Sequence, residues 1–190
     1  GNPYVEEACM RVAGLNYDKE EYRTSLYYFE RLHDAASSNS TTNTALLGIM
    51  RCNQHMGETA AVIDAATQLL AQETIADETR QEALYLRAKA YLSNQQYGLA
   101  VVDLTPLAKE VRTAIGAEAK YQLAYAYMQL GSIDMAEEEI MAFTQMQTTQ
   151  QYWLAKSMIL LADINMQRND TFQAKQYLLA LQANYHQNDD

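Results

Sequence analysis

Apolar positions recur with helical spacing in five stretches of the chain, which lie 36 to 38 residues apart and fill nearly all of its 190 residues. The clearest stretch runs from Leu123 to Phe143 and reads Leu-Ala-x-x-Tyr-x-x-x-Gly-x-Ile-x-x-Ala-x-x-x-Ile-x-x-Phe. A fixed period of this size is typical of stacked helical repeats. The pattern therefore predicts an all-α array of antiparallel helix pairs that forms a single domain.

The five repeats are expected at about residues 4–36, 45–71, 79–110, 117–145 and 152–185. Their helices are expected at residues 4–16, 19–36, 45–55, 58–71, 79–93, 97–109, 117–130, 133–145, 152–167 and 171–185. The segment Ser37–Thr44 is rich in Ser, Thr and Asn and is predicted to be a loop. The start Gly1-Asn2-Pro3, without an initiator Met, indicates a piece excised from a longer protein.

Small residues occupy the position where the two helices of a repeat should cross. On the first helices these are Ala13, Met50, Ala88, Ala124 and Ala162, and on the second helices Ser25, Val62, Ala100, Ala136 and Ala174. Residues four and seven positions further along each second helix continue the same face, so they are expected to be buried. They are Phe29, Ala66, Leu104, Ile140 and Leu178, followed by Leu32, Leu69, Leu107, Phe143 and Leu181.

Local signals mark several helix ends. Thr79 and Glu82 have the spacing of a capping box, which predicts a helix start at Thr79. Gly57 and Gly131 fall where a left-handed residue would close a first helix. Pro106 lies inside an expected helix, where it removes a hydrogen bond, so a kink or break is expected near Leu104.

This pattern resembles the tetratricopeptide repeat family over residues 4–185, most closely in the third and fourth repeats. The matching residues are Ala88, Tyr91, Tyr97, Ala100, Leu104 and Leu107, then Ala124, Tyr127, Gly131, Ala136, Ile140 and Phe143. The period is longer than the family's usual 34 residues, and the Pro between repeats and the Trp near each repeat start are missing. The resemblance implies a right-handed superhelical solenoid. The longer period and the stretch 152–156 also resemble repeat-rich cell-envelope proteins of Gram-negative bacteria, which implies a periplasmic or envelope location.

In this family the first helix of each repeat lines a concave groove that binds partners. Aligning the repeats by register assigns eight positions of the sequence to this groove. We call them the predicted groove residues: Met10, Leu47, Arg51, Tyr85, Lys89, Tyr121, Tyr125 and Met128. Tyr and Met suit protein interfaces because they offer adaptable apolar area. The two cations would suit an acidic peptide. The alternative is that the tyrosines pack between repeats as core. The family's clamp of Lys and Asn, which binds a terminal carboxylate, is not expected. Its Lys positions are occupied here by Met10, Tyr85 and Tyr121.

Composition excludes several classes of function. The formal net charge is −10, with 14 basic residues scattered among 24 acidic ones, which disfavours nucleic-acid and anionic-membrane surfaces. Cys9 and Cys52 have no metal-binding spacing and are expected to be buried free thiols. No catalytic, phosphate-binding or metal motif occurs, so neither an enzyme nor a cofactor or metal site is expected. The run Glu137-Glu138-Glu139 is expected to be a solvated face.

Two functions are consistent with these features, and a third is disfavoured. The first is a protein-interaction scaffold that binds an extended peptide or a partner helix in its groove. The second is a structural segment of a longer solenoid that builds a homo-oligomer or an envelope assembly, because Leu179, Ala180 and Ala183 lie beside the core face of the last helix. The third is glycan binding by stacked tyrosines. It is disfavoured because nothing in the sequence would bind the hydroxyl groups of a sugar.

Overall fold

The structure is a computed structural model that describes the backbone of residues 2–186 and the side chains of residues 2–184. The described chain is built from helices, which fall into two compact units, Gly1–Gln96 and Tyr97–Asp190. The amino-terminal unit holds α1 (Pro3–Asp18), α2 (Tyr22–Ala35), α3 (Asn39–Met56), α4 (Thr59–Leu70) and α5 (Asp77–Ser93). The carboxyl-terminal unit holds α6 (Tyr97–Leu107), α7 (Ala114–Gln129), α8 (Ile133–Gln145), α9 (Gln151–Gln167) and α10 (Thr171–His186).

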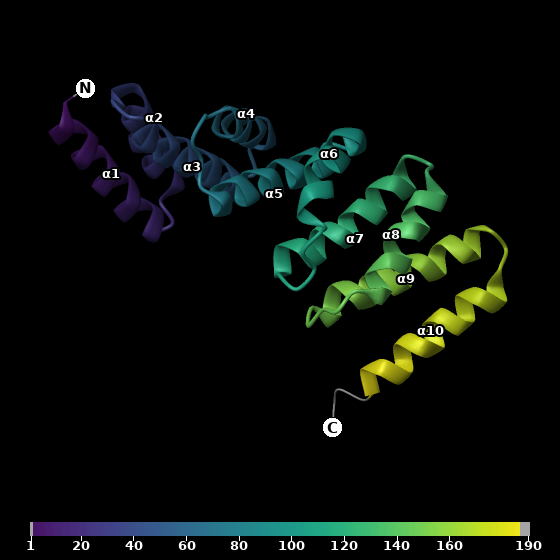
Figure 1. Cartoon of the computed structure of the whole chain (residues 1–190). Coiled ribbons are helices and arrows are strands. Elements are labelled where there is room, and N and C mark those ends of the chain that lie inside the picture. Colours follow the sequence, from purple (N-terminus) through teal and green to yellow (C-terminus); the bar gives the residue numbers. More distant parts are fainter. Residues whose placement is uncertain (1, 187–190) are drawn as a thin grey trace. The chain divides into compact units, whose positions relative to one another are not determined.

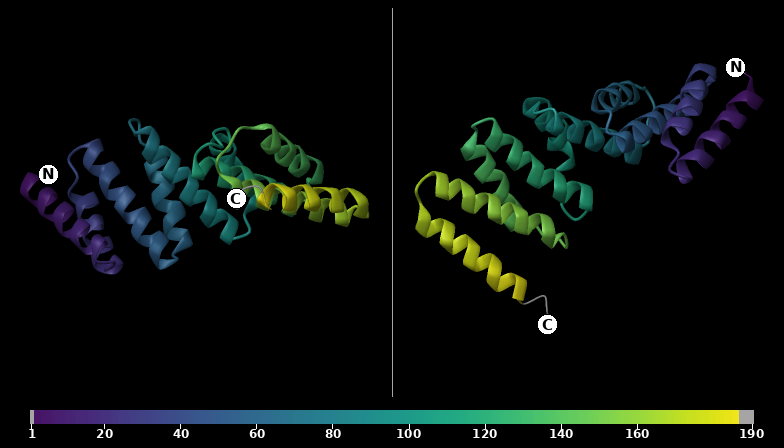
Figure 2. Two further views of the ribbon diagram at one scale, coloured as in Figure 1. Left: turned by 90° about the horizontal axis from the view of Figure 1, so that it is seen from below. Right: turned by 180° about the vertical axis from the view of Figure 1, so that it is seen from behind.

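Each unit has two layers of helices. In the amino-terminal unit α3 contacts α1 and α5 in one layer, and α2 and α4 pack behind them (Figure 1). In the carboxyl-terminal unit α7 and α9 form the first layer, and α6, α8 and α10 pack against them (Figure 2). The predicted all-α fold of antiparallel helix pairs is confirmed. The boundary between the units falls between α5 and α6, inside the third predicted repeat.

Small residues are buried at the helix crossings, as predicted. All ten crossing positions are at most 2 % exposed, and Ser25 donates a hydrogen bond of 2.8 Å to the carbonyl oxygen of Ala13 on the partner helix. Cys9 and Cys52 are buried free thiols in the same core cluster as Phe29 and Leu32, which confirms that prediction. Burial raises the pKa of the Cys52 thiol, so the group stays neutral and unreactive near pH 7.

On α10 the buried stripe of the second helices does not continue past Ala174. Leu178 is 46 % exposed and Leu181 is only partly buried, so the prediction that Leu178 belongs to the core is wrong. In the earlier helices this stripe is covered by the first helix of the following repeat. Within the described residues α10 contacts only α9, and its outer side has no such cover.

Two helix starts differ from the prediction. The segment predicted to be a loop is largely helical, because α3 begins at Asn39 with Ser38 as its cap. The Ser38 hydroxyl accepts a hydrogen bond from the Thr41 amide at 3.1 Å, and the Thr42 hydroxyl donates back to the Ser38 carbonyl. The capping box is also wrong, since α5 begins at Asp77 after Ala76, which supplies no side-chain cap. Both glycine turns are confirmed, since Gly57 and Gly131 each have a φ of 76°.

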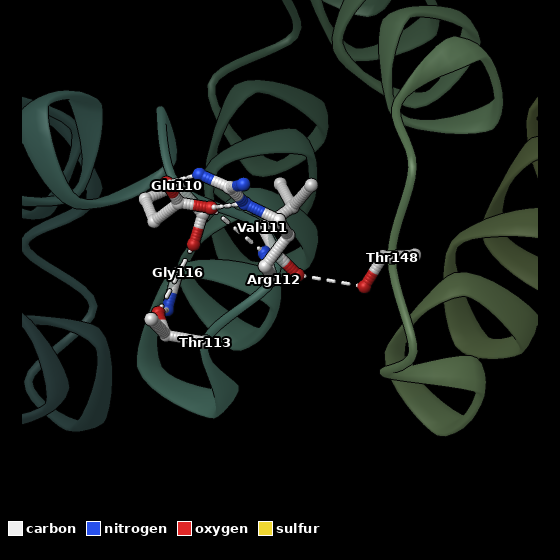
Figure 3. A network of polar contacts seen from close by, with 6 residues as sticks. All are labelled: Glu110, Val111, Arg112, Thr113, Gly116 and Thr148. Carbon is white, nitrogen blue, oxygen red and sulfur yellow. Dashed lines mark hydrogen bonds and ion pairs between the residues drawn. The ribbon is translucent and has the colours of Figure 1, made fainter.

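The region after Pro106 connects α6 to α7. The helix continues through Leu104 and ends at Leu107, so the predicted break falls three residues later than expected. The connection is held by polar contacts (Figure 3): Glu110 receives two hydrogen bonds from the Arg112 guanidinium, and Thr148 donates to the Val111 carbonyl at 2.6 Å. Val111 itself is 2 % exposed and packs in a core cluster with Phe143.

The run of three glutamates is not uniformly solvated. Glu139 pairs with Lys120 of α7 at 2.5 Å, and that lysine side chain is only 12 % exposed. Glu137 pairs with Arg168 at the end of α9, also at 2.5 Å. Only Glu138 fits the predicted solvated face, because its neighbours connect α8 to the two adjacent helices.

Candidate functional site

The first-layer face of the amino-terminal unit carries a hollow between α1 and α3. Its volume is about 200 Å³ and it is lined by Gly14, Tyr17, Asp18, Phe29, Thr44, Leu47, Gly48 and Arg51. Two predicted groove residues, Leu47 and Arg51, therefore lie in it together. Gly14 and Tyr17 of α1 also line the hollow. Met10, one turn before Gly14 on α1, is 39 % exposed and does not line it.

A second hollow adjoins the first on the same face. It has a volume of about 320 Å³ and lies between the start of α3 and the connection from α4 to α5. Ser, Thr and Asn dominate its lining, and Asn43 donates a hydrogen bond of 2.7 Å to the Thr74 carbonyl beside it. Thr44 and Leu47 line both hollows. The face therefore offers two adjoining depressions that meet at a ridge of α3 formed by Thr44 and Leu47.

Arg51 is fully engaged by a residue that the sequence analysis did not assign to the groove. Its Nε and Nη2 atoms donate to the two carboxylate oxygens of Glu82 on α5, each at 2.6 Å. These hydrogen bonds raise the pKa of Arg51 above its ordinary value. The pair is bidentate and connects the first helices of two successive repeats. Arg51 therefore contributes little free positive charge to the face.

An aromatic cluster borders the first hollow at the end of α3. The rings of Tyr22 and His55 are stacked with centroids 4.2 Å apart, and Tyr17 meets both rings edge-on. The Tyr17 hydroxyl and His55 Nε2 lie 3.0 Å apart in a hydrogen bond. Burial raises the pKa of Tyr17, so its hydroxyl stays neutral. The hydrogen bond and the ring contacts hold the Tyr17 ring in place at the edge of the hollow.

The remaining groove residues of this unit, Tyr85 and Lys89, contact each other on α5. The Lys89 ammonium donates to the Tyr85 hydroxyl at 3.2 Å and lies 5.1 Å from the centre of its ring. Both side chains are half-buried. The spacing of four residues on one helix produces this contact, as the register implies.

The first-layer face of the carboxyl-terminal unit is a row of aromatic rings. Tyr97 of α6 meets Tyr125 of α7 at 6.3 Å, and Tyr125 stacks on Tyr121 at 6.5 Å. Tyr121 contacts Trp153 of α9 at 5.7 Å, and Trp153 meets Tyr152 at 4.9 Å. Tyr121, Tyr125 and Met128 are half-buried and pack on the core between α7 and α9. Tyr121 and Tyr125 therefore pack on the core, as the core alternative predicted, and they also leave area at the surface. That this surface binds a partner stays a prediction.

Lys156 lies over this row. Its ammonium is 4.9 Å from the ring centre of Tyr121, 5.2 Å from that of Trp153 and 5.4 Å from that of Tyr152. These distances suit cation–π attraction. Burial raises the pKa of Tyr121 even though the nearby ammonium opposes the shift. The sequence analysis missed Lys156, although its spacing of four from Tyr152 places the two on one face of α9.

The exposed face of α9 continues beyond Lys156. Tyr152 is 60 % exposed, Ile159 46 % and Met166 53 %, and their spacing places them along one side of the helix. Contiguous apolar side chains on the exposed face of a helix are a common mark of an interaction surface.

Neither unit presents a metal-binding cluster in its described part. Within residues 2–184, no group of three or more His, Cys, Asp or Glu side chains is placed to hold a metal ion. Across the described helices, none is long and apolar enough to cross a bilayer.

Layered helix pairs with small residues at each crossing define a helical-repeat protein. Residues 117–149, which include α7 without its first turn and all of α8, match the model of the tetratricopeptide repeat. The chain thus carries a tetratricopeptide repeat, and its fold is the all-α fold of tetratricopeptide repeat proteins.

Solved structures agree with this assignment. A crystal structure of MamA is similar with a TM-score of 0.75 at 14 % identity, covering 94 % of this chain and 96 % of that one. MamA from Desulfovibrio magneticus RS-1 gives 0.74 at 15 % identity over 98 % of both chains. TPR-like repeats of a Podosopora anserina protein assigned to kinesin light chain give 0.69 at 16 % identity over 96 % of both. These likenesses show the fold. No curated protein matches the chain in sequence.

Proposed function

We propose that this chain is a non-enzymatic scaffold that binds an extended peptide or a partner's helix along the first-layer faces of its units. The observation that carries the proposal is the pair of adjoining hollows that share Thr44 and Leu47. An extended chain places successive side chains about 3.3 Å apart along its length, so it can occupy neighbouring depressions across one ridge. Of the predicted groove residues, Leu47 lines both hollows and Arg51 lines the first.

The aromatic face of the carboxyl-terminal unit supports the same function. Tyr and Trp are enriched among residues that dominate binding energy at protein interfaces. Here they form a contiguous row in which Tyr121, Tyr125 and Trp153 already pack on the core, so these three rings would lose little conformational entropy on binding. Exposed Ile159 and Met166 extend the apolar surface along α9.

The test is quantitative affinity capture of partners with variants of each face. Tyr121 and Tyr125 are poor targets, because both are half-buried and their truncation would also weaken the core. We choose Thr44→Arg on the shared ridge and the double variant Tyr152→Ser/Ile159→Ser on α9. The matched control is Met135→Ser/Met141→Ser, which removes two exposed apolar side chains from α8 in the second layer.

Partners specific for this chain should be depleted at least tenfold with a first-layer variant and retained with the α8 control. Equal capture by all variants, or equal loss with the α8 control, would contradict the proposal. Circular dichroism and thermal melting of each variant confirm that its helices are intact.

Self-association is a second candidate, favoured by the exposed side of α10. Phe172, Leu178 and Leu179 are 71 %, 46 % and 47 % exposed on this one helix. A hollow of about 160 Å³ between α9 and α10, with Leu154, Met158 and Leu181 in its lining, adds to this surface. Light scattering over a concentration series tests it. A mass that grows with concentration, and falls back with Leu178→Ser/Leu179→Ser, supports self-association, whereas a constant monomer mass contradicts it.

A further inference from the structure

Two glycines inside helices open the first hollow of the amino-terminal unit. Glycine has a lower helix propensity than alanine in the interior of a helix, so a glycine at such a position needs a structural explanation. A Cβ on Gly14 of α1 would meet no atom within 4 Å, which shows that the space in front of it is open. A Cβ on Gly48 of α3 would come within 2.4 Å of the Phe29 ring. The absence of both side chains leaves the Phe29 ring as part of the floor of the hollow.

The size of the hollow fits one side chain. Pockets for cofactors and drug-sized molecules measure about 300–1,000 Å³, whereas this one holds about 200 Å³. Its apolar lining comes from Phe29, from Leu47 and from the body of Tyr17. Two polar groups of the lining are already engaged: the Arg51 guanidinium donates to Glu82, and the Thr44 hydroxyl donates to the Ser40 carbonyl. The occupant should therefore be aliphatic.

The rim of the hollow is acidic. Asp18 lines it, and the residues Lys19, Glu20 and Glu21 follow in the turn to α2. Of the charged side chains that line the hollow, Arg51 is paired with Glu82 and Asp18 remains. Asp18 is exposed and has no ion-pair partner among residues 2–184. The chain's net charge of −10 adds a field that attracts cations.

We propose that this hollow anchors one large aliphatic side chain of an extended peptide, and that a Lys or Arg beside it in the peptide pairs with Asp18. Leu, Ile and Met have the size and flexibility to contact the Phe29 ring in the opening that Gly14 and Gly48 leave. The proposal rests on the scaffold function above and gives it a partner chemistry: a basic, aliphatic segment. It differs from the acidic peptide that the sequence suggested, because Arg51 is already neutralised.

The experiment is selection of a displayed random heptapeptide library on the full chain. Enriched peptides are then synthesised with a fluorescent label and titrated by fluorescence polarisation. The variants are Gly14→Leu, which fills the hollow with a good helix former, and Asp18→Asn, which removes the rim charge. Gly98→Leu on α6 is the matched control, because a Cβ there also meets no atom within 4 Å and Gly98 lies in the other unit.

We expect a consensus with one Leu, Ile or Met beside Lys or Arg. Gly14→Leu should weaken such a peptide at least tenfold, and Gly98→Leu should leave it unchanged. Asp18→Asn should weaken it severalfold, but should have no effect on a peptide whose basic residue is replaced by Gln. Helicity measured by circular dichroism verifies that the variants are folded.

A consensus without an aliphatic residue, a preference for acidic peptides, or binding that survives Gly14→Leu would each overturn this inference. The capture experiment on α9 is independent of it, because α9 lies in the other unit, whereas Thr44 lines this hollow itself. Loss of capture with the α9 variant, together with unchanged peptide binding in Gly14→Leu, would support the scaffold function and contradict only this anchor site.

Discussion

Gly48 of α3 faces the ring of Phe29 of α2 so closely that a Cβ on Gly48 would lie 2.4 Å from the ring's Cδ1 atom. The two residues belong to successive repeats, and Phe29 is 9 % exposed in the core between them. The missing side chain lets α3 approach α2, and it also leaves the ring as part of the floor of the hollow. One contact thus sets both the packing of the repeats and the shape of the candidate site.

Gly48→Ala should destabilise the amino-terminal unit. The new methyl group forces the Phe29 ring out of its packed position, and overpacking of this kind costs about 1–3 kcal/mol. The gain in helix propensity, up to about 1 kcal/mol, offsets only part of it. Denaturant unfolding measures the net loss. Combining the change with Phe29→Leu, which makes room for the methyl, should remove most of the penalty; strict additivity of the two changes would contradict the stated cause.

Gly116→Ala should destabilise the carboxyl-terminal unit more strongly than a change at an open glycine. A Cβ at Gly116 would lie 1.9 Å from the Glu110 carbonyl oxygen, which belongs to the backbone and cannot rotate away (Figure 3). The connection between α6 and α7 would have to shift, and the Thr113 cap on the Gly116 amide would be lost. We expect a loss of about 1–3 kcal/mol or more by denaturant unfolding. Gly98→Ala is the control and should lose nothing.

The Glu110 carboxylate should titrate far below an ordinary glutamate. Hydrogen bonds from the Arg112 side chain, and to a smaller extent from its backbone amide, lower the pKa of Glu110 from 4.5 to about 2. The folded pKa is the lower one, so the stabilisation is fully present above pH 4.5 and is lost as the pH falls through about 2. The energetic effect is small because the group is exposed. Carbon-detected NMR titration measures it, and Arg112→Ala should return the pKa toward 4.5.

Much of the fold follows from the sequence because helix crossings demand small residues at fixed intervals. The series that begins at Ala13 and the one that begins at Ser25 identify every crossing without knowledge of loop lengths. Leu178 is the exception, since its burial depends on a helix that would follow α10, and helical spacing alone does not show whether such a cover exists. The handedness of the superhelix stays a prediction.

The candidate site was predicted only in part, for a similar reason. Register predicted that Leu47 and Arg51 share one face of a first helix, and the two residues line one hollow. It could not show that Glu82 neutralises Arg51, since that pair depends on how closely α3 and α5 approach. It also assigned Phe29 wholly to the core, although the two glycines leave it at the floor of the hollow.

Ser38→Ala should shorten α3 from its start. The segment from Ser37 to Thr44 looked like a loop because Ser, Thr and Asn compete with helical hydrogen bonds. Here the Ser38 hydroxyl caps the Thr41 amide, and the hydroxyls of Thr42 and Thr44 donate to carbonyls four residues earlier. Loss of the cap should cost about 0.5–2 kcal/mol. Amide hydrogen exchange should accelerate in the first turn of α3 only; Ser38→Asp, which retains a capping oxygen, should retain protection.

Lys156 should be energetically coupled to the rings beneath it. Its ammonium lies 5.4 Å from the ring centre of Tyr152 and close to two further rings, and such contacts contribute about 0.5–1 kcal/mol at exposed sites. A double-mutant cycle with Lys156→Met and Tyr152→Leu, followed by denaturant unfolding, should give a coupling energy in that range. Lys175 on α10 is exposed, so a parallel cycle with Lys175→Met should give no coupling. Equal values in the two cycles would mean that the ammonium gains nothing from the aromatic row.

A partner that binds this row should change the fluorescence of Trp153, the only tryptophan in the chain. The change should be smaller in Lys156→Met, because the ammonium helps to hold the rings.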